Sequence, residues 1–187
     1  MRKVIVSEFV TLDGVMEAPD QWQFPFWNDE TEKFKVGELF ASDALLLGRV
    51  TYQEFAGSWP SITDESSFAD RMNSLPKFVA STTLKEPLEW NATLIKGNIA
   101  QEVSKLKQQP GQDILVSGGA GLVHSLMKQD LIDEYRLLVY PVVLGSGKRL
   151  FTDGGTVTLK LVETKPMGSD VVLLTYQPAP KTGDSHG

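Results

Sequence analysis

The sequence contains no cysteine among its 187 residues, and it has only two histidines. Without cysteine the chain cannot form disulfides, thiolate nucleophiles, zinc ribbons or iron–sulfur clusters. His124 falls in a predicted helix and His186 lies close to the end of the sequence, so the two do not form a metal-binding cluster. We therefore expect no metal site.

Long apolar runs and an excess of positive charge are also absent. Eighteen Lys and Arg residues against 24 Asp and Glu give a net charge of −6, whereas non-specific binding to nucleic acid or anionic membranes needs a positive field. No stretch approaches the ~18 apolar residues of a membrane span, and the run at 4–6 is too short for a signal-peptide core. These absences predict a cytoplasmic protein with no nucleic-acid or membrane partner.

The length and composition match one globular domain. A chain of this size is close to one typical domain of about 150 residues, and 41% hydrophobic with 22% charged residues is a globular composition. We predict a single domain over residues 1–177. The segment 178–187 has two prolines, two glycines and no large apolar residue, so we predict a mobile tail there.

Short buried strands alternate with helical patterns along most of the chain. The predicted strands lie at 4–10, 43–48, 77–81, 92–95, 113–116 and 135–143, and the predicted helices lie at about 28–40, from 49, 64–74, 98–107 and from 121. This alternation indicates an α/β fold, a three-layer sandwich around a mostly parallel sheet. A final antiparallel hairpin, predicted at 159–162 and 171–176, makes that sheet mixed.

The most distinctive local motif is a turn of small residues between a predicted strand and a helix. Ser117-Gly118-Gly119-Ala120-Gly121 leaves backbone N–H groups exposed at a helix N-terminus, and such groups favour an anion such as pyrophosphate. The glycines do not follow the GxGxxG spacing of a dinucleotide fingerprint. A tight turn without a ligand remains the alternative.

Two other predicted strands end in residues that suit phosphate. Gly48 and Arg49 stand at a strand-to-helix junction, and guanidinium pairs bidentately with phosphate. Ser81 and Thr82 follow the next strand and supply hydroxyl groups. A surface arginine and an ordinary turn cap are the alternatives. Because ligands of open α/β sheets bind beyond the carboxyl ends of the strands, we expect all three junctions to converge on one ligand.

Several short motifs occur in a characteristic order over residues 2–177. They are Thr11-Leu12-Asp13-Gly14-Val15, Gly48-Arg49-Val50-Thr51-Tyr52, Val79-Ala80-Ser81-Thr82, Ile114-Leu115-Val116-Ser117-Gly118-Gly119, Asp133-Glu134-Tyr135-Arg136 and Leu144-Gly145-Ser146-Gly147. In this order they resemble the dihydrofolate reductase-like superfamily. The resemblance is closest to the C-terminal reductase domain of the bifunctional riboflavin-biosynthesis deaminase/reductase and its stand-alone bacterial relatives.

This resemblance implies an NADPH-dependent reductase, often a homodimer, that transfers hydride to a pyrimidine- or pteridine-like heterocycle. Carried over by position, the pyrophosphate would lie on Gly118, Gly119, Ala120, Gly121 and Leu122. The junction at Gly48, with Arg49, Thr51, Ser81 and Thr82, would hold phosphates, including the adenosine 2′-phosphate. Val10, Asp13 and Val15 would lie near the nicotinamide.

Reduction of a C=N or C=O group also requires a proton, which a carboxyl group in an apolar pocket can supply. Asp13 and Glu30 are the two candidates. Asp13 could instead be a turn residue before Gly14, and Glu30 a helix N-terminal charge. An NADP-binding sensor or scaffold without turnover, or a purely structural dimer, would explain the same sequence without catalysis.

Overall fold

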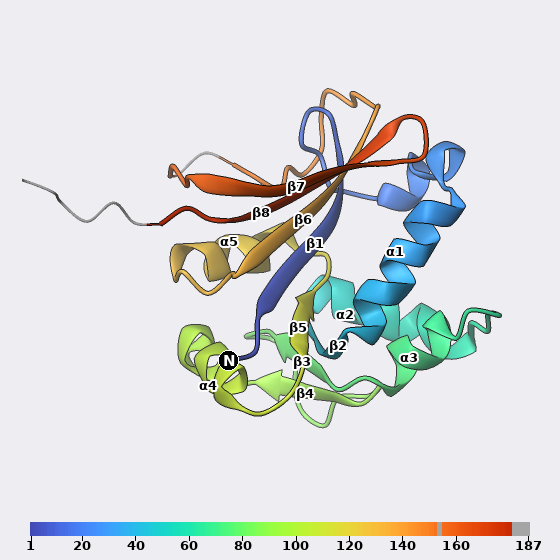
Figure 1. The fold of residues 1–187 in the computed structure, drawn as a ribbon. Helices are drawn as coiled ribbons and strands as arrows, with labels where there is room; N and C mark the ends of the chain where they lie inside the picture. The colour runs from blue at the N-terminus through green and yellow to red at the C-terminus, as the bar shows by residue number, and fades with distance from the viewer. Residues whose placement is uncertain (153–154, 181–187) are drawn as a thin grey trace, which may run out of the picture.

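The computed structural model describes residues 1–152 and 155–180, and these residues form one eight-stranded sheet (Figure 1). The strands are β1 Val4–Thr11, β2 Ser42–Gly48, β3 Lys77–Ala80, β4 Ala92–Ile95, β5 Asp113–Val116, β6 Glu134–Tyr140, β7 Leu159–Met167 and β8 Val171–Pro178. Their order in the sheet is β4-β3-β2-β5-β1-β6-β8-β7. All pairings among β1 to β6 are parallel, and β8 pairs antiparallel with both β6 and β7, which confirms the predicted mixed sheet.

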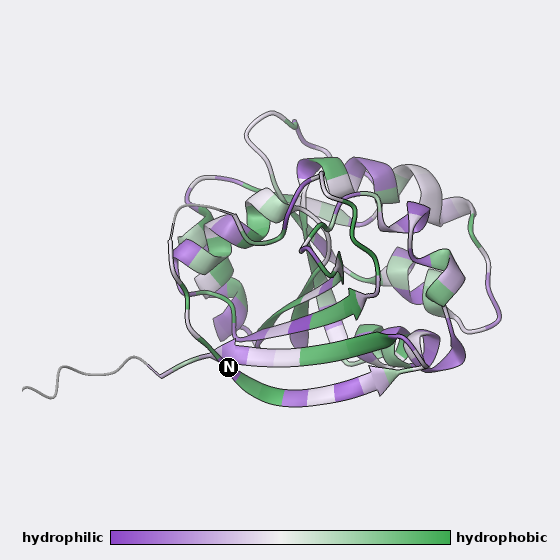
Figure 2. Ribbon diagram, turned by 90° about the horizontal axis from the view of Figure 1, so that it is seen from above, coloured by the Kyte–Doolittle hydropathy of each residue, from purple (hydrophilic) through white to green (hydrophobic). Residues whose placement is uncertain are grey.

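Helices cover both faces of this sheet and complete the predicted three layers. They are α1 Asp29–Phe40, α2 Arg49–Ser58, α3 Phe68–Ser74, α4 Ile99–Gln108 and α5 Ala120–Lys128, with short 3-10 turns η1 Pro19–Gln21, η2 Phe24–Phe26 and η3 Trp59–Ser61. In Figure 2 the helices carry both hydrophobic and hydrophilic residues along their length. This mixture is typical of helices with one face on a sheet and the other in solvent.

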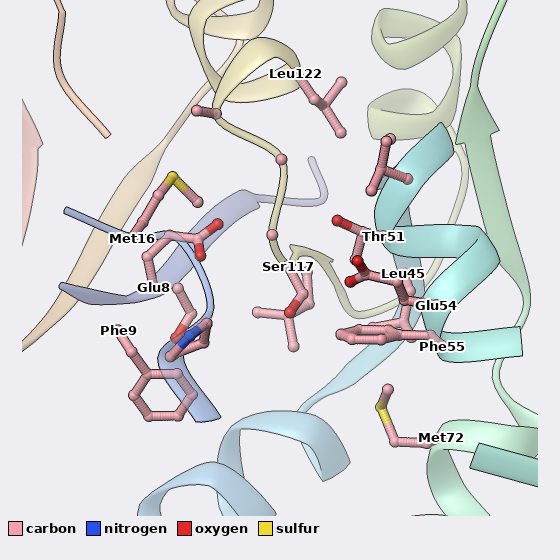
Figure 3. A pocket seen from close by; sticks show the side chains of 18 of the residues that line it. Glu8, Phe9, Met16, Leu45, Thr51, Glu54, Phe55, Met72, Ser117 and Leu122 are labelled. Carbon is pink, nitrogen blue, oxygen red and sulfur yellow. The ribbon is translucent and has the colours of Figure 1, made fainter. Parts of the chain in front are cut away.

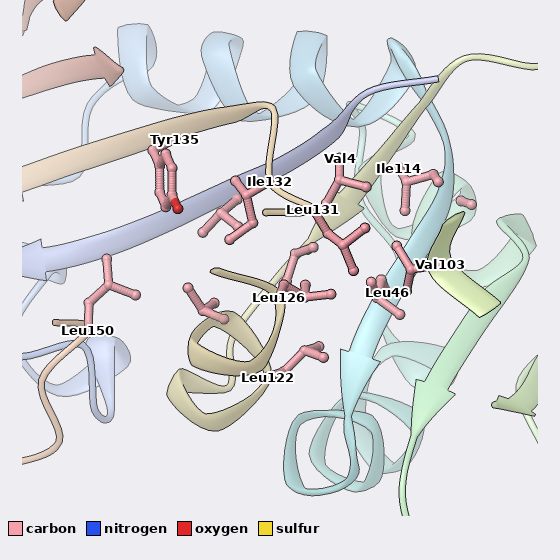
Figure 4. Packing of buried hydrophobic residues seen from close by; sticks show 14 of the residues in the cluster. Val4, Leu46, Val103, Ile114, Leu122, Leu126, Leu131, Ile132, Tyr135 and Leu150 are labelled. Carbon is pink, nitrogen blue, oxygen red and sulfur yellow. The ribbon is translucent and has the colours of Figure 1, made fainter. Parts of the chain in front are cut away.

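The alternation of side chains along each strand produces two separate apolar layers. Val4 and Leu46 point to the face covered by α4 and α5, where Leu126 is fully buried (Figure 4). Ile5 and Leu45 point to the opposite face, which α1, α2 and α3 cover. Because β1 has strands on both sides and helices on both faces, nearly all of its residues are buried.

The observed element bounds differ from the predicted ones at a few ends. β6 stops at Tyr140 because Pro141, which has no backbone N–H, follows it. α3 begins at Phe68 instead of 64, since the side chain of Asp64 accepts a hydrogen bond from the Ala69 amide ahead of the helix. β7 extends to Met167, five residues beyond its predicted end.

The predicted tail falls only partly within the described residues. Pro178 still belongs to β8, whereas 181–187 lie outside the described part of the chain. In the described ranges no helix is long and apolar enough to cross a membrane.

Candidate active site

A cavity of about 1170 Å³ opens along the carboxyl ends of the parallel strands. Its walls come from β1, the loop after β1, α1, α2, the ends of β3 and β5, and the start of α5. Figure 3 shows Glu8 and Met16 on one side of the cavity and Thr51, Glu54 and Phe55 on the other. A cavity of this size and position is typical of ligand sites in α/β sheets.

Two helices begin at this cavity without a side-chain cap. The side chain of Asn28 caps α1 by accepting from the Thr31 amide at 2.9 Å, and that of Asn98 caps α4. By contrast, α2 follows Gly48 and α5 follows Gly119, and neither glycine provides a capping side chain. The first N–H groups of α2 and α5 therefore remain available to a ligand in the cavity.

The two uncapped junctions lie in contact with each other. A Cβ added at Gly118 would come within 2.6 Å of Thr51 Oγ1, and one at Gly119 would lie 4.0 Å from the Gly48 backbone nitrogen. Both glycines have positive φ angles, +67° and +77°, a conformation that residues with a Cβ rarely adopt. The structure thus brings these two junctions together at one edge of the sheet, as the sequence predicts.

Most of the residues predicted to bind a cofactor line this cavity. They are Gly48, Arg49, Thr51, Ser81, Thr82, Gly118, Gly119, Ala120, Gly121 and Leu122. Val10 and Val15 lie outside its lining, with 5% and 1% of their surfaces exposed. The cofactor roles of all these residues remain predictions.

The two predicted proton donors lie outside the cavity lining. The carboxylate of Asp13 accepts hydrogen bonds from the Thr11 hydroxyl at 2.6 Å and from the Gly145 amide at 2.8 Å. These bonds lower the pKa of Asp13 to about 2, which disfavours a protonated carboxyl. Glu30 is exposed in the first turn of α1 and accepts from the Gly168 amide at 3.4 Å. Both residues remain candidates only by sequence resemblance.

A different carboxyl group lies in the cavity wall, and the sequence reasoning missed it. Glu8 is only 6% exposed, and its Oε1 has no hydrogen-bond partner among the described residues. Burial raises the pKa of Glu8 to about 8, even though Lys35 and a hydrogen bond from the Gly118 amide lower it. The available signal was a charged residue inside a strand predicted to be buried on both faces.

A second buried carboxyl group, that of Glu38 on α1, has a lowered pKa, whereas the pKa of Glu8 is raised. Glu38 binds Lys35 at 2.7 Å and Arg136 at 3.2 Å. Burial by itself would raise the pKa of Glu38, but these two cations hold it below the usual value. Lys35 binds Glu38 and the Ser7 hydroxyl. It forms no ion pair with Glu8 among the described residues, although its charge still lowers the pKa of Glu8.

Aromatic side chains form part of the cavity wall. Phe9, Trp27, Phe55 and Trp59 all line it. Trp22, by contrast, packs in the core against Tyr140 at a ring distance of 5.3 Å. The walls can therefore accept a flat ring system.

Comparison with known proteins assigns the chain to a family. The model of the RibD C-terminal domain matches residues 2–173. The chain belongs to the RibD C-terminal domain family. Within the family it is 35% identical over 179 residues to YyaP of Bacillus subtilis (strain 168), which is described as uncharacterized, and the match covers 94% of each protein. Membership of the RibD C-terminal domain family supports a reductase function of the type found in that family.

Solved structures confirm the fold that the motifs indicate. A protein of Shewanella sp. PV-4 named for riboflavin biosynthesis matches with a TM-score of 0.76 and 22% identity, over 95% of this chain and 99% of that one. The riboflavin biosynthesis reductase Rib7 of Saccharomyces cerevisiae matches with a TM-score of 0.62 and 16% identity, over 95% and 90%. The dihydrofolate reductase of Enterococcus faecalis matches with a TM-score of 0.63 and 13% identity, over 94% and 96%. The RibD C-terminal domain of this chain therefore has the dihydrofolate reductase-like fold.

Proposed function

We propose that this protein is an NADPH-dependent reductase of a small heterocyclic substrate, pyrimidine- or pteridine-like. The observation behind the proposal is the contact between the Gly48 and Gly118 junctions, which puts two uncapped helix N-termini at one cavity. Family membership and the likeness to a structure named as a riboflavin biosynthesis reductase support the same activity.

The cavity residues fit the parts of NADPH. The pyrophosphate would accept from backbone N–H groups of residues 119–122, where the glycines allow close approach. The N–H of Gly118, in the same turn, bonds to Glu8. Arg49, Ser81 and Thr82 would hold the adenosine 2′-phosphate, for which guanidinium and hydroxyl groups are suitable donors. When bound, NADPH supplies the hydride. The protein then has to orient the substrate, exclude water and deliver a proton.

The remainder of the cavity suits a planar substrate. Phe9 and Trp27 provide apolar surface on the side of β1 and α1, and Phe55 and Trp59 provide it on the side of α2. Flat heterocycles bind well between such rings. We also propose a homodimer, as the resemblance implies, and one domain over 1–177 and a cytoplasmic location, as the length and composition of the sequence indicate.

Calorimetry with NADPH, NADH and the protein tests nucleotide binding, and NADPH absorbance with a panel of pterins and pyrimidines tests turnover. We expect NADPH to bind more tightly than NADH and to be oxidised in the presence of at least one compound of the panel. Tight binding without oxidation would instead indicate a nucleotide sensor. Failure to bind either nucleotide would contradict the proposal.

A further inference from the structure

Glu8 is a buried polar group with an unused hydrogen-bonding atom, and it faces the cavity. It lies on β1 two residues after Val6, on the face of the strand that α5 covers. The Gly118 amide bonds to its carboxyl group, but Oε1 has no partner in the described part of the chain. An unpartnered carboxyl oxygen in a protein interior is costly unless a ligand completes its hydrogen bonding.

A second unpartnered oxygen lies in the same cavity wall. Oε1 of Gln23, in the loop between β1 and α1, is buried and has no hydrogen-bond partner among the described residues. An amide oxygen only accepts hydrogen bonds, whereas a protonated carboxyl can donate one. Together Glu8 and Gln23 therefore suit a ligand with an acceptor atom and an N–H group.

Burial favours the neutral form of Glu8, whereas the charge of Lys35 lowers its pKa and the charge of Glu38 raises it by less. Lys35 is bonded to Glu38, and Glu38 also binds Arg136, which binds Glu134. The other charged side chains that line the cavity come from the loop after β1, from α1, from α2 and the loop beyond it, and from the loop after β6: Glu17, Glu32, Arg49, Glu54, Asp64 and Lys148. None of these forms an ion pair with Glu8 within the described residues.

Glu8 also lies beside the turn of small residues at the end of β5. Its carboxyl group is bonded to Gly118, in the turn assigned above to the pyrophosphate. Phe9, its neighbour along β1, and Lys35 of α1 line the same cavity. A carboxyl group beside the nucleotide turn is therefore available to a substrate bound in the rest of the cavity.

Resting on the function proposed above, we propose that Glu8 is the proton donor of the reduction and that Gln23 binds an N–H group of the substrate. The substrate class is then a neutral heterocycle with a C=N or C=O bond beside a ring or exocyclic N–H. The carbon of that bond gains hydride, and its nitrogen or oxygen takes the carboxyl proton of Glu8. NADPH is oxidised to NADP⁺, the substrate gains two electrons, and the Glu8 carboxylate regains a proton from water.

The test is single-turnover oxidation of NADPH by the wild-type protein and by Glu8→Gln, with the pterin and pyrimidine panel, over a range of pH. We expect the wild-type rate to fall as pH rises past about 8, and the variant to be slower by about 10²-fold or more, as for loss of a general acid. The variant should also lack the loss of rate at high pH. Its Kd for NADPH should stay within about twofold, because glutamine preserves the shape of the site.

Glu102→Gln is the matched control, because Glu102 lies on α4 in an ion pair with Lys105 and outside the cavity lining. It should behave as the wild type. Gln23→Leu should raise the KM for compounds with the N–H group, with little change in kcat, and should spare analogues that lack it.

The outcomes separate the two proposals. If the wild type does not bind NADPH, the proposed function fails as well. If it binds and oxidises NADPH and Glu8→Gln keeps its rate and pH profile, only the role of Glu8 is overturned. Nucleotide binding without oxidation of any compound also overturns that role. If Glu8→Gln fails to fold, ¹³C NMR titration of the wild-type glutamate carboxyls decides, since the role requires one that titrates near pH 8 and responds to ligand.

Discussion

Gly118 lies so close to Thr51 that a methyl group on its α carbon would stand 2.6 Å from the Thr51 hydroxyl oxygen. The end of β5 and the first turn of α2 are thereby held together at one edge of the sheet. Thr51 is branched at Cβ and 8% exposed, so it has little freedom to move away.

Gly118→Ala should therefore destabilise the fold and weaken NADPH binding. The added methyl overpacks against Thr51, and Gly118 has a φ of +67°, so we expect a loss of about 2–4 kcal/mol in the free energy of unfolding. Urea unfolding and calorimetry measure the two effects.

Gly57→Ala is the matched control for this change. Gly57 lies within α2, and a Cβ there would meet no atom within 4 Å, so this variant should gain up to ~1 kcal/mol. The double variant Gly118→Ala with Thr51→Ala should recover part of the lost stability. Equal urea midpoints for Gly118→Ala and the wild type would argue against the close packing.

Arg49→Ala should weaken NADPH binding more than NADH binding, if Arg49 contacts the 2′-phosphate. Arg49 is exposed and its guanidinium donates to Gln53 at 3.0 Å, so the contact would be partly screened. We expect a loss of about 1–2 kcal/mol for NADPH, or roughly 5- to 30-fold. Calorimetry at low and high salt measures it.

Arg49→Lys keeps the positive charge but lacks the planar guanidinium that can donate two hydrogen bonds at once. Its NADPH affinity should therefore fall between those of the wild type and Arg49→Ala. The NADH affinity should be nearly the same in all three. An equal loss for both nucleotides on Arg49→Ala would rule out the assigned 2′-phosphate contact.

The stability of the wild type should fall as pH rises from about 4.5 to 8 because of Glu8. Burial raises the folded-state pKa of Glu8 to about 8 from 4.5, so in this interval the folded protein holds a proton that the unfolded chain has released. The free energy of unfolding then decreases with pH, by at most ~1.4 kcal/mol per unit for one group. Glu8→Gln should lack this decrease.

Thermal unfolding of the wild type and of Glu8→Gln, measured over this pH range, checks the expectation. The quantity to compare is the difference between their stabilities at each pH. Lys77, whose pKa burial lowers to about 8, contributes equally to both proteins and cancels. A constant difference across the range would show that Glu8 does not titrate there.

Asp13→Asn should destabilise the loop that follows β6 with little direct effect on proton transfer. The Asp13 carboxylate accepts from the Gly145 amide at 2.8 Å and from the Leu144 amide at 3.3 Å. Its pKa is lowered to about 2 from 3.8, so its stabilising effect is present above about pH 4 and is lost as pH falls toward 2. The variant should unfold more easily than the wild type near pH 7 and similarly near pH 2.

Single-turnover NADPH oxidation with Asp13→Asn and Glu30→Gln compares the sequence-based donors with Glu8. A collapse of the rate in either variant, with the fold intact, would favour that residue over Glu8 as the proton donor.

The sheet and the convergence of the junctions were predictable because they follow from general rules. Parallel strands place Gly48 and Ser117 at the same edge whatever the details of packing. Element ends were less predictable, since they depend on individual contacts such as the hydrogen bond from the Ala69 amide to Asp64 at the start of α3. The sequence analysis did not identify Glu8 as a site residue. The mostly apolar segment 4–10 predicts a buried strand, and its one charged residue becomes distinctive only once the structure shows that it is buried at the cavity.

The proposed proton donor, Glu8, and the proposed substrate contacts lie on different kinds of element in this molecule. β1 is hydrogen-bonded to β5 on one side and β6 on the other, so its carboxyl group is anchored in the stiffest part of the chain. Gln23 and Trp27 lie in the long connection between β1 and α1. Loops tolerate substitution and insertion far better than central strands. Changes in that connection should therefore alter which molecule this protein accepts without moving the proposed proton donor.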